Sequence, residues 1–239
     1  MAPALVLLHG FTHTGRSWDD VAHALRERYR PLAPDLRGHG SAAGVTPVTL
    51  EAVVSDLDRV APGRFVLGGY SMGGRIALQY ALARPARVRR LVLIGATAGI
   101  SDPAQRTARV KADEQLAGEI ERMPLEAFAT RWARTPVLAD QPPEIAARVH
   151  ADRLRNNPQG LARALRGLGA GALPPVWHRL GELHIPVLLL VGERDQKFLE
   201  IARGMADEIS SARLEVVPGA GHAAHLERPE AVAAAMARE

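Results

Sequence analysis

Short apolar segments alternate with longer segments of helical periodicity along most of this chain of 239 residues. Parallel strands that are buried on both faces read as continuous apolar runs, as the first of these segments does. Their alternation with helices predicts a doubly wound, mostly parallel α/β sheet. The predicted strands are Ala4–Leu8, Tyr29–Ala33, Phe65–Gly68, Arg90–Ile94, Pro186–Val191 and Leu214–Val217. The predicted helices are Trp18–Glu27, Leu50–Ala61, Gly73–Ala83, Leu199–Ile209 and Pro229–Ala237.

The segment from residue 101 to residue 183 breaks this alternation. It contains helical stretches with a proline at or near the start, where the missing N–H does no harm, and no convincing strand. We predict an α/β core of residues 1–100 and 184–239, with residues 101–183 as a helical cap inserted after the strand at 90–94. The cap would cover the carboxyl ends of the strands, where ligands of open α/β sheets bind. The predicted cap helices are Pro103–Arg122, Pro124–Arg134, Pro143–Arg155 and Gln159–Leu168.

Composition excludes several classes of protein. The chain has no cysteine, which rules out disulfides, thiolate metal sites and cysteine nucleophiles. Of 30 basic residues only Lys111 and Lys197 are lysines, and the arginines are spread among acids without a basic block that would follow a nucleic acid backbone. The apolar start is too short for a signal segment, and no segment approaches the roughly 20 apolar residues that span a bilayer. We expect a soluble cytoplasmic protein that binds neither nucleic acid nor membrane.

The motif Gly69-Tyr70-Ser71-Met72-Gly73 fits the pattern G-x-S-x-G. It follows a predicted strand and precedes a predicted helix, which is the context that a nucleophile elbow requires. The two glycines leave room for a tight turn and a close helix crossing. A glycine-rich junction without chemistry is the competing interpretation, and the strand–turn–helix context favours a catalytic Ser71.

A catalytic serine needs a base, and His222 is the best placed of the nine histidines. It lies in a glycine-rich loop directly after the last predicted strand, from which a side chain can reach over the edge of the sheet. His9 and His225 are more simply explained as structural residues of their own loops. The competing histidines are His9, His39 and His225.

The base in turn needs a carboxylate that fixes its tautomer and stabilises the imidazolium. Asp195 follows the predicted strand Pro186–Val191, and Glu193 in the same loop is its rival. The order Ser71, Asp195, His222 is the order of the triad in α/β-hydrolases. Three residues of the right type, each just beyond a predicted strand, predict a catalytic triad.

Negative charge that develops during such a reaction needs N–H donors. The N–H of Met72, at the start of a predicted helix, is one candidate. The second is the N–H of Phe11, in the loop after the first predicted strand. Together they predict an oxyanion hole beside Ser71.

The motifs HGF, DLRGHG, GYSMG, GERD and GAGH together resemble those of the α/β-hydrolase superfamily. Longer runs resemble a narrower family, the 2-succinyl-6-hydroxy-2,4-cyclohexadiene-1-carboxylate synthases. The similarity extends over nearly the whole chain, including the cap, where members of the superfamily usually diverge. The runs are Gly69–Arg75, Gly192–Phe198 and Ala220–His225 in the core, and Gln105–Arg109, Trp132–Val137 and Leu154–Asn157 in the cap.

This resemblance implies a lyase of menaquinone biosynthesis. Such an enzyme eliminates pyruvate from 2-succinyl-5-enolpyruvyl-6-hydroxy-3-cyclohexene-1-carboxylate. The resemblance also implies that the triad abstracts a proton, with the serine as the base, and forms no acyl-enzyme. It implies that no metal and no organic cofactor is needed.

A substrate with several carboxylates calls for arginines, because the planar guanidinium binds a carboxylate through two parallel hydrogen bonds. Arg75 lies four residues after Ser71, about one helical turn, and so stays close to it. The resemblance implies that Arg109 and Arg155 descend from the cap to complete the carboxylate site. It also implies that Tyr70 and Trp132 line the pocket.

Two other functions remain open. The same triad could serve a hydrolase that cleaves a small ester, thioester or C–C bond through an acyl-enzyme, although convergent arginines favour a polyanionic acid. A non-catalytic binding module would not need all three triad residues. We expect a small-molecule polycarboxylate as the partner, and a monomer is compatible with the sequence. Ala133 stands where the resemblance leads us to expect an aromatic residue; if that residue contacts the substrate in relatives, affinity or specificity would differ here.

Overall fold

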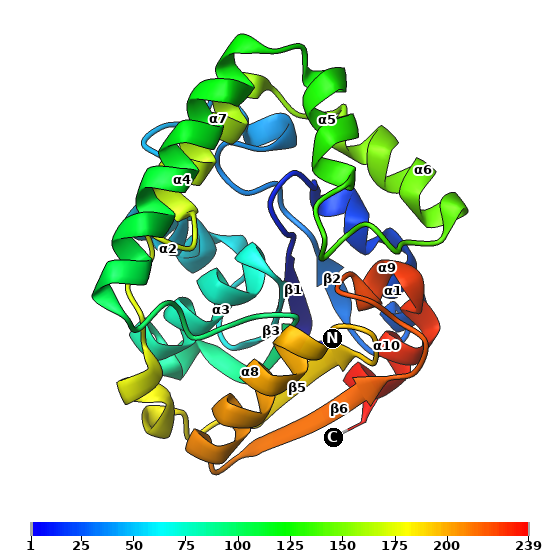
Figure 1. The fold of residues 1–239 in the computed structure, drawn as a ribbon. Helices are drawn as coiled ribbons and strands as arrows, with labels where there is room; N and C mark the ends of the chain where they lie inside the picture. Colours follow the sequence, from blue (N-terminus) through cyan, green and yellow to red (C-terminus); the bar gives the residue numbers. More distant parts are fainter. Residues whose placement is uncertain (1, 239) are drawn as a thin grey trace.

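A six-stranded parallel sheet forms the centre of the molecule (Figure 1). The computed structural model describes residues 2–238. The strand order is β2-β1-β3-β4-β5-β6, and every neighbouring pair is parallel. The predicted doubly wound α/β sheet is therefore confirmed. The strands are β1 (Ala4–Leu8), β2 (Arg30–Leu32), β3 (Phe65–Tyr70), β4 (Val88–Ile94), β5 (Val187–Gly192) and β6 (Ala212–Val217).

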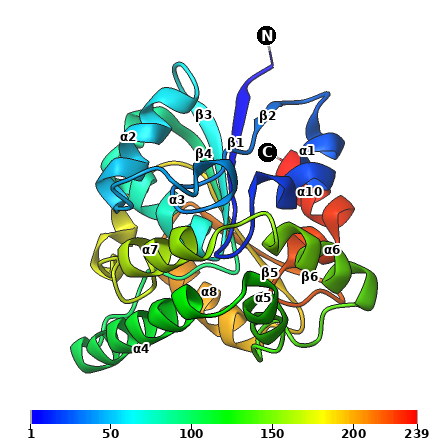
Figure 2. The same ribbon diagram turned by 90° about the horizontal axis from the view of Figure 1, so that it is seen from above.

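Helices cover both faces of the sheet, which explains why the central strands are apolar throughout (Figure 2). In β1, Val6 and Leu8 belong to one buried cluster, whereas Leu5 and Leu7 belong to another on the opposite face. Successive side chains of a strand point to opposite faces, so both sets are buried only if both faces are covered. One face carries α2 (Leu50–Val60), α3 (Met72–Ala83) and α8 (Gln196–Glu208), and the other carries α1 (Asp19–Leu25) and α10 (Pro229–Ala237).

Four helices lie between β4 and β5 in the sequence and cross the carboxyl end of the sheet (Figure 1). They share a small apolar core of their own, in which Ile120, Phe128 and Leu161 are buried. The division at residues 101 and 183 into a core and a separate cap domain stays a prediction; we use the word cap for these helices. They are α4 (Pro103–Arg122), α5 (Leu125–Ala133), α6 (Pro143–Arg153) and α7 (Pro158–Leu168).

Helix α7 holds the cap onto the core through a close backbone contact. Arg163 donates a hydrogen bond to the carbonyl oxygen of Ala43 at 2.8 Å. Further along the helix, Gly167 lies so close to the loop before α2 that an added Cβ would overlap the carbonyl oxygen of Val48. The position therefore has no room for any side chain.

Some element boundaries differ from the prediction. Helix α8 begins at Gln196 rather than Leu199, because its first two residues are polar and carry no apolar periodicity. Strand β6 begins at Ala212, and the structure adds one short α-helix, α9 (Ala224–Glu227), that the sequence did not indicate. None of the helices of residues 2–238 is long and apolar enough to cross a membrane. The 3-10 helices are η1 (Gly15–Trp18), η2 (Gly40–Ala42), η3 (Pro85–Arg87) and η4 (Trp177–Glu182).

Two glycines of the cap helices, Gly167 and Gly118, predict opposite responses to alanine. Gly167→Ala should lower the free energy of unfolding by about 1–3 kcal/mol, because α7 must move away from Val48. Gly118→Ala, in α4, meets nothing closer than the mobile Arg122 side chain at 3.6 Å and should raise stability by up to about 1 kcal/mol. Denaturant unfolding of both variants measures this. Equal effects of the two substitutions would contradict the close contact.

Candidate active site

Ser71 occupies a strained turn between β3 and α3. Its backbone has φ 51° and ψ −107°, a region that residues with a side chain rarely adopt. The turn is fixed on both sides: the N–H of Ser71 donates to the carbonyl of Ile94 at 2.9 Å, and a Cβ on Gly73 would overlap the carbonyl oxygen of Leu8. This geometry lifts the hydroxyl of Ser71 out of the sheet at its carboxyl end.

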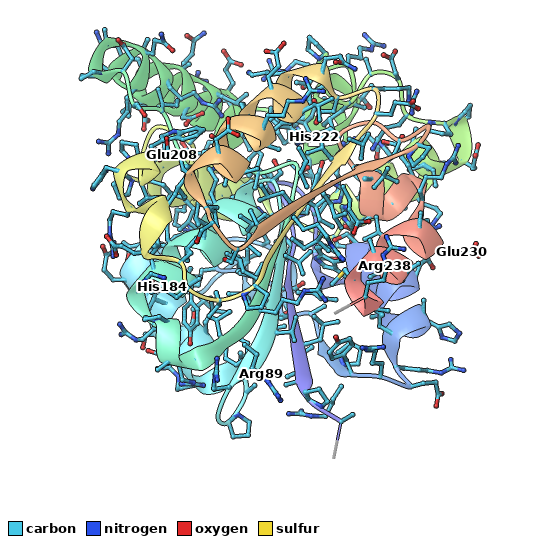
Figure 3. All side chains as sticks on the ribbon, turned by 90° about the horizontal axis from the view of Figure 1, so that it is seen from below. Arg89, His184, Glu208, His222, Glu230 and Arg238 are labelled. Atoms are coloured by element: carbon cyan, nitrogen blue, oxygen red, sulfur yellow. The ribbon has the colours of Figure 1, made fainter. Side chains whose placement is uncertain are left out.

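His222 and Asp195 complete a hydrogen-bonded chain with Ser71. The Nε2 atom of His222 lies 3.2 Å from the Oγ of Ser71, and its Nδ1 lies 2.6 Å from the Oδ2 of Asp195. An ionised carboxylate only accepts hydrogen bonds, so Nδ1 carries the proton and Nε2 is free to accept the serine proton. Figure 3 places His222 at the end of the molecule where the green cap helices lie, whereas Arg89 in β4 lies at the opposite end.

Glu193, the rival of Asp195, bonds to a backbone N–H and not to His222. The Oε2 atom of Glu193 accepts the N–H of Gly219 at 2.8 Å and so braces the loop that leads to His222. A second brace runs through Glu227, whose Oε2 accepts both Arg194 at 2.6 Å and the N–H of Gly221 at 2.8 Å. The loops that carry Asp195 and His222 are therefore tied together by two acids that are not part of the triad.

The rival histidines are buried, and none of them lines the cavity at Ser71 among the described residues. His9 bonds to the carbonyl of Gly10 through Nδ1 and accepts the N–H of Leu36 through Nε2, both at 2.9 Å. His39 lies against the ring of His9. Both ring nitrogens of His225 are buried without a hydrogen-bond partner, and its ring packs 4.4 Å from those of Trp18 and Tyr70. The structure does not bring these three histidines to Ser71.

A cavity of about 630 Å³ opens beside Ser71 between the sheet and the cap. Its wall includes His222 and Met72 from the core and Trp132 from the cap, and Trp132 packs edge-on against Phe11 with ring centroids 5.3 Å apart. The volume is in the range of small-molecule sites. Among residues 2–238 no group of three or more His, Asp or Glu side chains is arranged to hold a metal ion.

The two residues that carry the predicted N–H donors, Phe11 and Met72, both line this cavity. Met72 is the first residue of α3, so its N–H has no acceptor within the helix. Phe11 follows β1 and lines the same cavity. Neither N–H has a hydrogen-bond acceptor among the described residues. Both are therefore available to an anion beside Ser71.

The loop that carries Phe11 is fixed by the end of α6. The carboxylate of Asp152 accepts both the N–H and the hydroxyl of Thr14. The side chain of Asn156 donates to the carbonyl of Thr12 at 2.8 Å. We call Asp152–Asn156 the α6 clamp. It ties one side of the cap to the loop after β1.

Two of the predicted arginines line the cavity. Burial and the charge of the neighbouring Arg109 lower the pKa of Arg75 to about 10, so Arg75 is still cationic at neutral pH. Its Nε is buried without a hydrogen-bond partner. Arg109 is half exposed and its Nε donates to Asp113 at 2.7 Å, which leaves its terminal nitrogens for the cavity.

Arg155 and Tyr70 do not line this cavity. Arg155 lies beyond the end of α6, half exposed, beside a separate hollow of about 230 Å³. Tyr70, the last residue of β3, points to the face covered by α1 and α10, where its ring lies 5.2 Å from that of His222. The resemblance implied that both residues belong to the pocket. Their side chains point elsewhere, because the direction of a side chain at the end of a helix or a strand cannot be read from the sequence.

Arg153 is the residue that the sequence did not single out. Its side chain is only 1% exposed, yet both of its Nη atoms lack a hydrogen-bond partner among the described residues. Its Nε reaches the hydroxyl of Thr12 at 3.4 Å, and burial lowers its pKa to about 10 against the opposing effects of Tyr70 and Asp152. Arg153 is the last residue of α6 and is buried, whereas Arg155 lies in the turn just beyond it and is half exposed, so only Arg153 points inward.

Comparison with known proteins places the chain among enzymes of one fold. The alpha/beta hydrolase family matches residues 5–235. A Bacillus subtilis (strain 168) protein, provisionally named 2-succinyl-6-hydroxy-2,4-cyclohexadiene-1-carboxylate synthase, is 39% identical over 95% of this chain and 86% of its own length. The synthase of that name from Enterobacter sp. (strain 638) is 35% identical over 99% of this chain and 91% of its own length. The solved structure of MenH from S. aureus is 30% identical, covers 98% of this chain and 91% of its own chain, and has a TM-score of 0.93.

The buried, unbonded ring of His225 predicts a loss of stability in acid. Burial, and then the nearby His13 and His222, lower its pKa well below the usual value near 6.5. Below pH 6.5 the unfolded chain binds a proton that the folded chain refuses, so the free energy of unfolding falls as the pH falls. His225→Phe keeps the ring contacts and removes this effect. The free energy of unfolding of the variant, relative to that of the natural chain, should rise by about 1.4 kcal/mol for each pH unit below 6.5.

Urea unfolding between pH 5 and pH 8 measures the difference. The exposed His184 provides the control, because His184→Gln should leave the pH dependence unchanged. A constant difference between His225→Phe and the natural chain over this range would contradict a neutral, buried His225.

Proposed function

Because the chain belongs to the alpha/beta hydrolase family, with relatives named as 2-succinyl-6-hydroxy-2,4-cyclohexadiene-1-carboxylate synthases, we propose that it is a lyase of that type. Its reaction would convert 2-succinyl-5-enolpyruvyl-6-hydroxy-3-cyclohexene-1-carboxylate into 2-succinyl-6-hydroxy-2,4-cyclohexadiene-1-carboxylate and pyruvate. The observation that carries the proposal is the hydrogen-bonded chain of Ser71, His222 and Asp195 beside a cavity with an unpaired arginine.

The charges of the site support an acidic substrate. Arg75 and Arg109 line the cavity, and the Nε of Arg75 is buried without a hydrogen-bond partner among the described residues. Arg153, whose Nη groups also lack partners, lies buried next to Thr12 and outside the cavity wall. A buried cation without a partner is costly, and a carboxylate of the substrate would satisfy it. Among the described residues Asp195 is the only acid in the wall of the cavity, and it is already bonded to His222. An uncharged ester would leave Arg75 without a partner.

The geometry also supports a proton abstraction. In this mechanism the hydroxyl of Ser71, activated by His222, takes the proton next to the ketone of the succinyl group, and that C–H bond breaks. The electron pair moves through the ring and breaks the C–O bond to the enolpyruvyl group. The leaving enolate of pyruvate is then protonated at carbon, which balances the proton that the triad has taken up and later releases. The serine proton passes to Nε2 of His222, and Asp195 stabilises the resulting imidazolium.

The N–H groups of Phe11 and Met72 have a place in this scheme. Removal of the proton turns the ketone oxygen of the succinyl group into an enolate oxygen, and two donors aimed at that oxygen would stabilise its charge. Each donor of this kind is worth about 3 kcal/mol in the transition state. No water molecule takes part in the elimination, in contrast to the hydrolysis of an acyl-enzyme.

The alternative from the sequence, a serine hydrolase, uses the same triad and would need Ser71 as a nucleophile. Its support is the complete elbow, which suits an acyl-enzyme as well as a proton transfer. The cytoplasmic location, the monomeric state and the independence from cofactors stay predictions from the sequence.

Ser71→Ala should abolish the release of pyruvate from the substrate generated in situ. The loss should be about 10³-fold or more in kcat, because the residues of a triad act as a unit. Pyruvate can be followed with a coupled dehydrogenase, and the hydrolysis of small esters with the same preparation. Rapid ester turnover without pyruvate would overturn the lyase and favour the hydrolase.

Arg75 and Arg155 form a matched pair for the carboxylate site. Arg75→Met should lower kcat/KM for pyruvate release by about 10- to 100-fold, because it removes charge-assisted hydrogen bonds to the substrate. Arg155→Met removes the same charge outside the cavity and should leave kcat/KM within about twofold. Thermal unfolding checks that both variants are folded. A larger effect at Arg155 than at Arg75 would reverse the assignment.

A further inference from the structure

Four cations line the cavity beside Ser71, and two of them are already neutralised. Arg109 bonds to Asp113 at 2.7 Å, and Arg194 bonds to Glu227 at 2.6 Å. Within the described part of the chain, neither Arg75 nor Lys197 lies within ion-pair distance of a carboxylate. The two unpaired cations differ in depth: the Nε of Arg75 is buried, whereas Lys197 is exposed at the rim. The four cations are Arg75, Arg109, Arg194 and Lys197.

The place of Lys197 in α8 makes this charge unusual. It is the second residue of the helix, where the free N–H groups already concentrate positive charge. The first turn contains no acid, and Asp195, which precedes it, makes no capping hydrogen bond because its carboxylate is bonded to His222. Among the described residues the charge of Lys197 meets no carboxylate; its Nζ lies 6.0 Å from the centre of the Phe198 ring, a contact that leaves the charge in place. A lysine here adds to the dipole of the helix instead of opposing it.

We propose that Lys197 binds a second carboxylate of the ligand at the mouth of the cavity, while Arg75 binds one at its deep end. The inference deepens the proposed function, on which it rests for the polycarboxylate character of the substrate. It assigns a separate position to each of two acidic groups. The ligand would therefore span the cavity from the base of α3 to the first turn of α8.

A solvated surface lysine is the competing explanation, and the chain supplies its own control. Lys111, the only other lysine, lies exposed on α4 and lines none of the described cavities. Replacing either lysine removes one unit of charge from the whole molecule. Only the replacement of Lys197 removes it from the cavity, so the pair separates a local contact from a general change of charge.

Binding of simple acids tests the inference without the reaction. The probes are the α,ω-dicarboxylates from succinate to suberate, with acetate as the monocarboxylate, titrated calorimetrically into the natural chain and the variants. For at least one dicarboxylate, Lys197→Gln should raise Kd by about 5- to 10-fold, the size expected for one charge-assisted contact. Lys197→Arg should restore most of the affinity, because it keeps the charge. Lys111→Gln should have no effect, and acetate should not distinguish the variants.

Several results would overturn the inference. Equal dicarboxylate affinities of Lys197→Gln and Lys111→Gln at every chain length would remove the second carboxylate site. Failure of every dicarboxylate to bind the natural chain would do so as well. Circular dichroism of Lys197→Gln guards against a folding defect, which is not expected at an exposed position.

Chemical labelling gives an independent readout because the chain has only two lysines. An N-hydroxysuccinimide ester of acetic acid acylates both, and peptide mass spectrometry measures the two rates. A bound dicarboxylate should slow the acylation of Lys197 by about fivefold or more and leave that of Lys111 unchanged. Equal rates at Lys197 with and without a saturating dicarboxylate would contradict the contact.

Kinetics separate this inference from the proposed function. If the natural chain releases pyruvate, Lys197→Gln should raise KM by about 5- to 10-fold and leave kcat within about threefold, because the contact is remote from the reacting bonds. An unchanged KM would overturn the role of Lys197 and leave the lyase standing. Dicarboxylate binding that depends on Lys197, in a chain that releases no pyruvate, would support the lysine site and overturn the lyase.

Discussion

The left-handed backbone of Ser71 is the constraint on which the site depends. A residue with a side chain adopts this conformation only where its surroundings hold it. Here they do so because α3 crosses β1 closely at Gly73. The same turn sets three features at once: the serine hydroxyl, the free N–H of Met72 and, one helical turn later, the guanidinium of Arg75. The crossing of α3 and β1 therefore sets the positions of the reactive group, the anion site and the deep cation together.

Much of this arrangement could be predicted from the sequence, because it follows from strands. A buried strand leaves a continuous apolar run, and the residue just beyond it lies at the carboxyl edge of the sheet. That rule predicted that Ser71, Asp195 and His222 lie together at this edge, where the structure brings them within hydrogen-bond distance. It was not sufficient for Arg155 and Tyr70, since their positions depend on which way a helix end or a strand end faces. Arg153 left no signal, because one arginine among many looks like any other until its burial is known.

Two buried arginines near the site lower the stability of the folded chain, because some of their nitrogens lack hydrogen-bond partners among the described residues. Arg75 and Arg153 have buried nitrogens without partners, whereas most buried polar groups in proteins are satisfied. The acids near them have other partners: Asp113 bonds to Arg109, and Asp152 bonds to Thr14. Buried polar groups left without partners in this way are typical of functional sites. Arg75, which lines the cavity, is therefore available to an anionic ligand of the proposed kind.

The α6 clamp has a consequence for the way a ligand enters. Asp152 and Asn156 hold the backbone at Thr12 and Thr14, next to Phe11 in the wall of the cavity. If α6 lifted away from the core, it would pull this wall apart, so an opening on that side would dismantle the site it exposes. On the other side, where Pro136 and Val137 line the cavity, the tie seen among the described residues is an exposed hydrogen bond from Arg194 to the carbonyl oxygen of Asp140 at 3.1 Å. Exchange of substrate and product is therefore expected on the side beside α8, with the α6 edge staying in place.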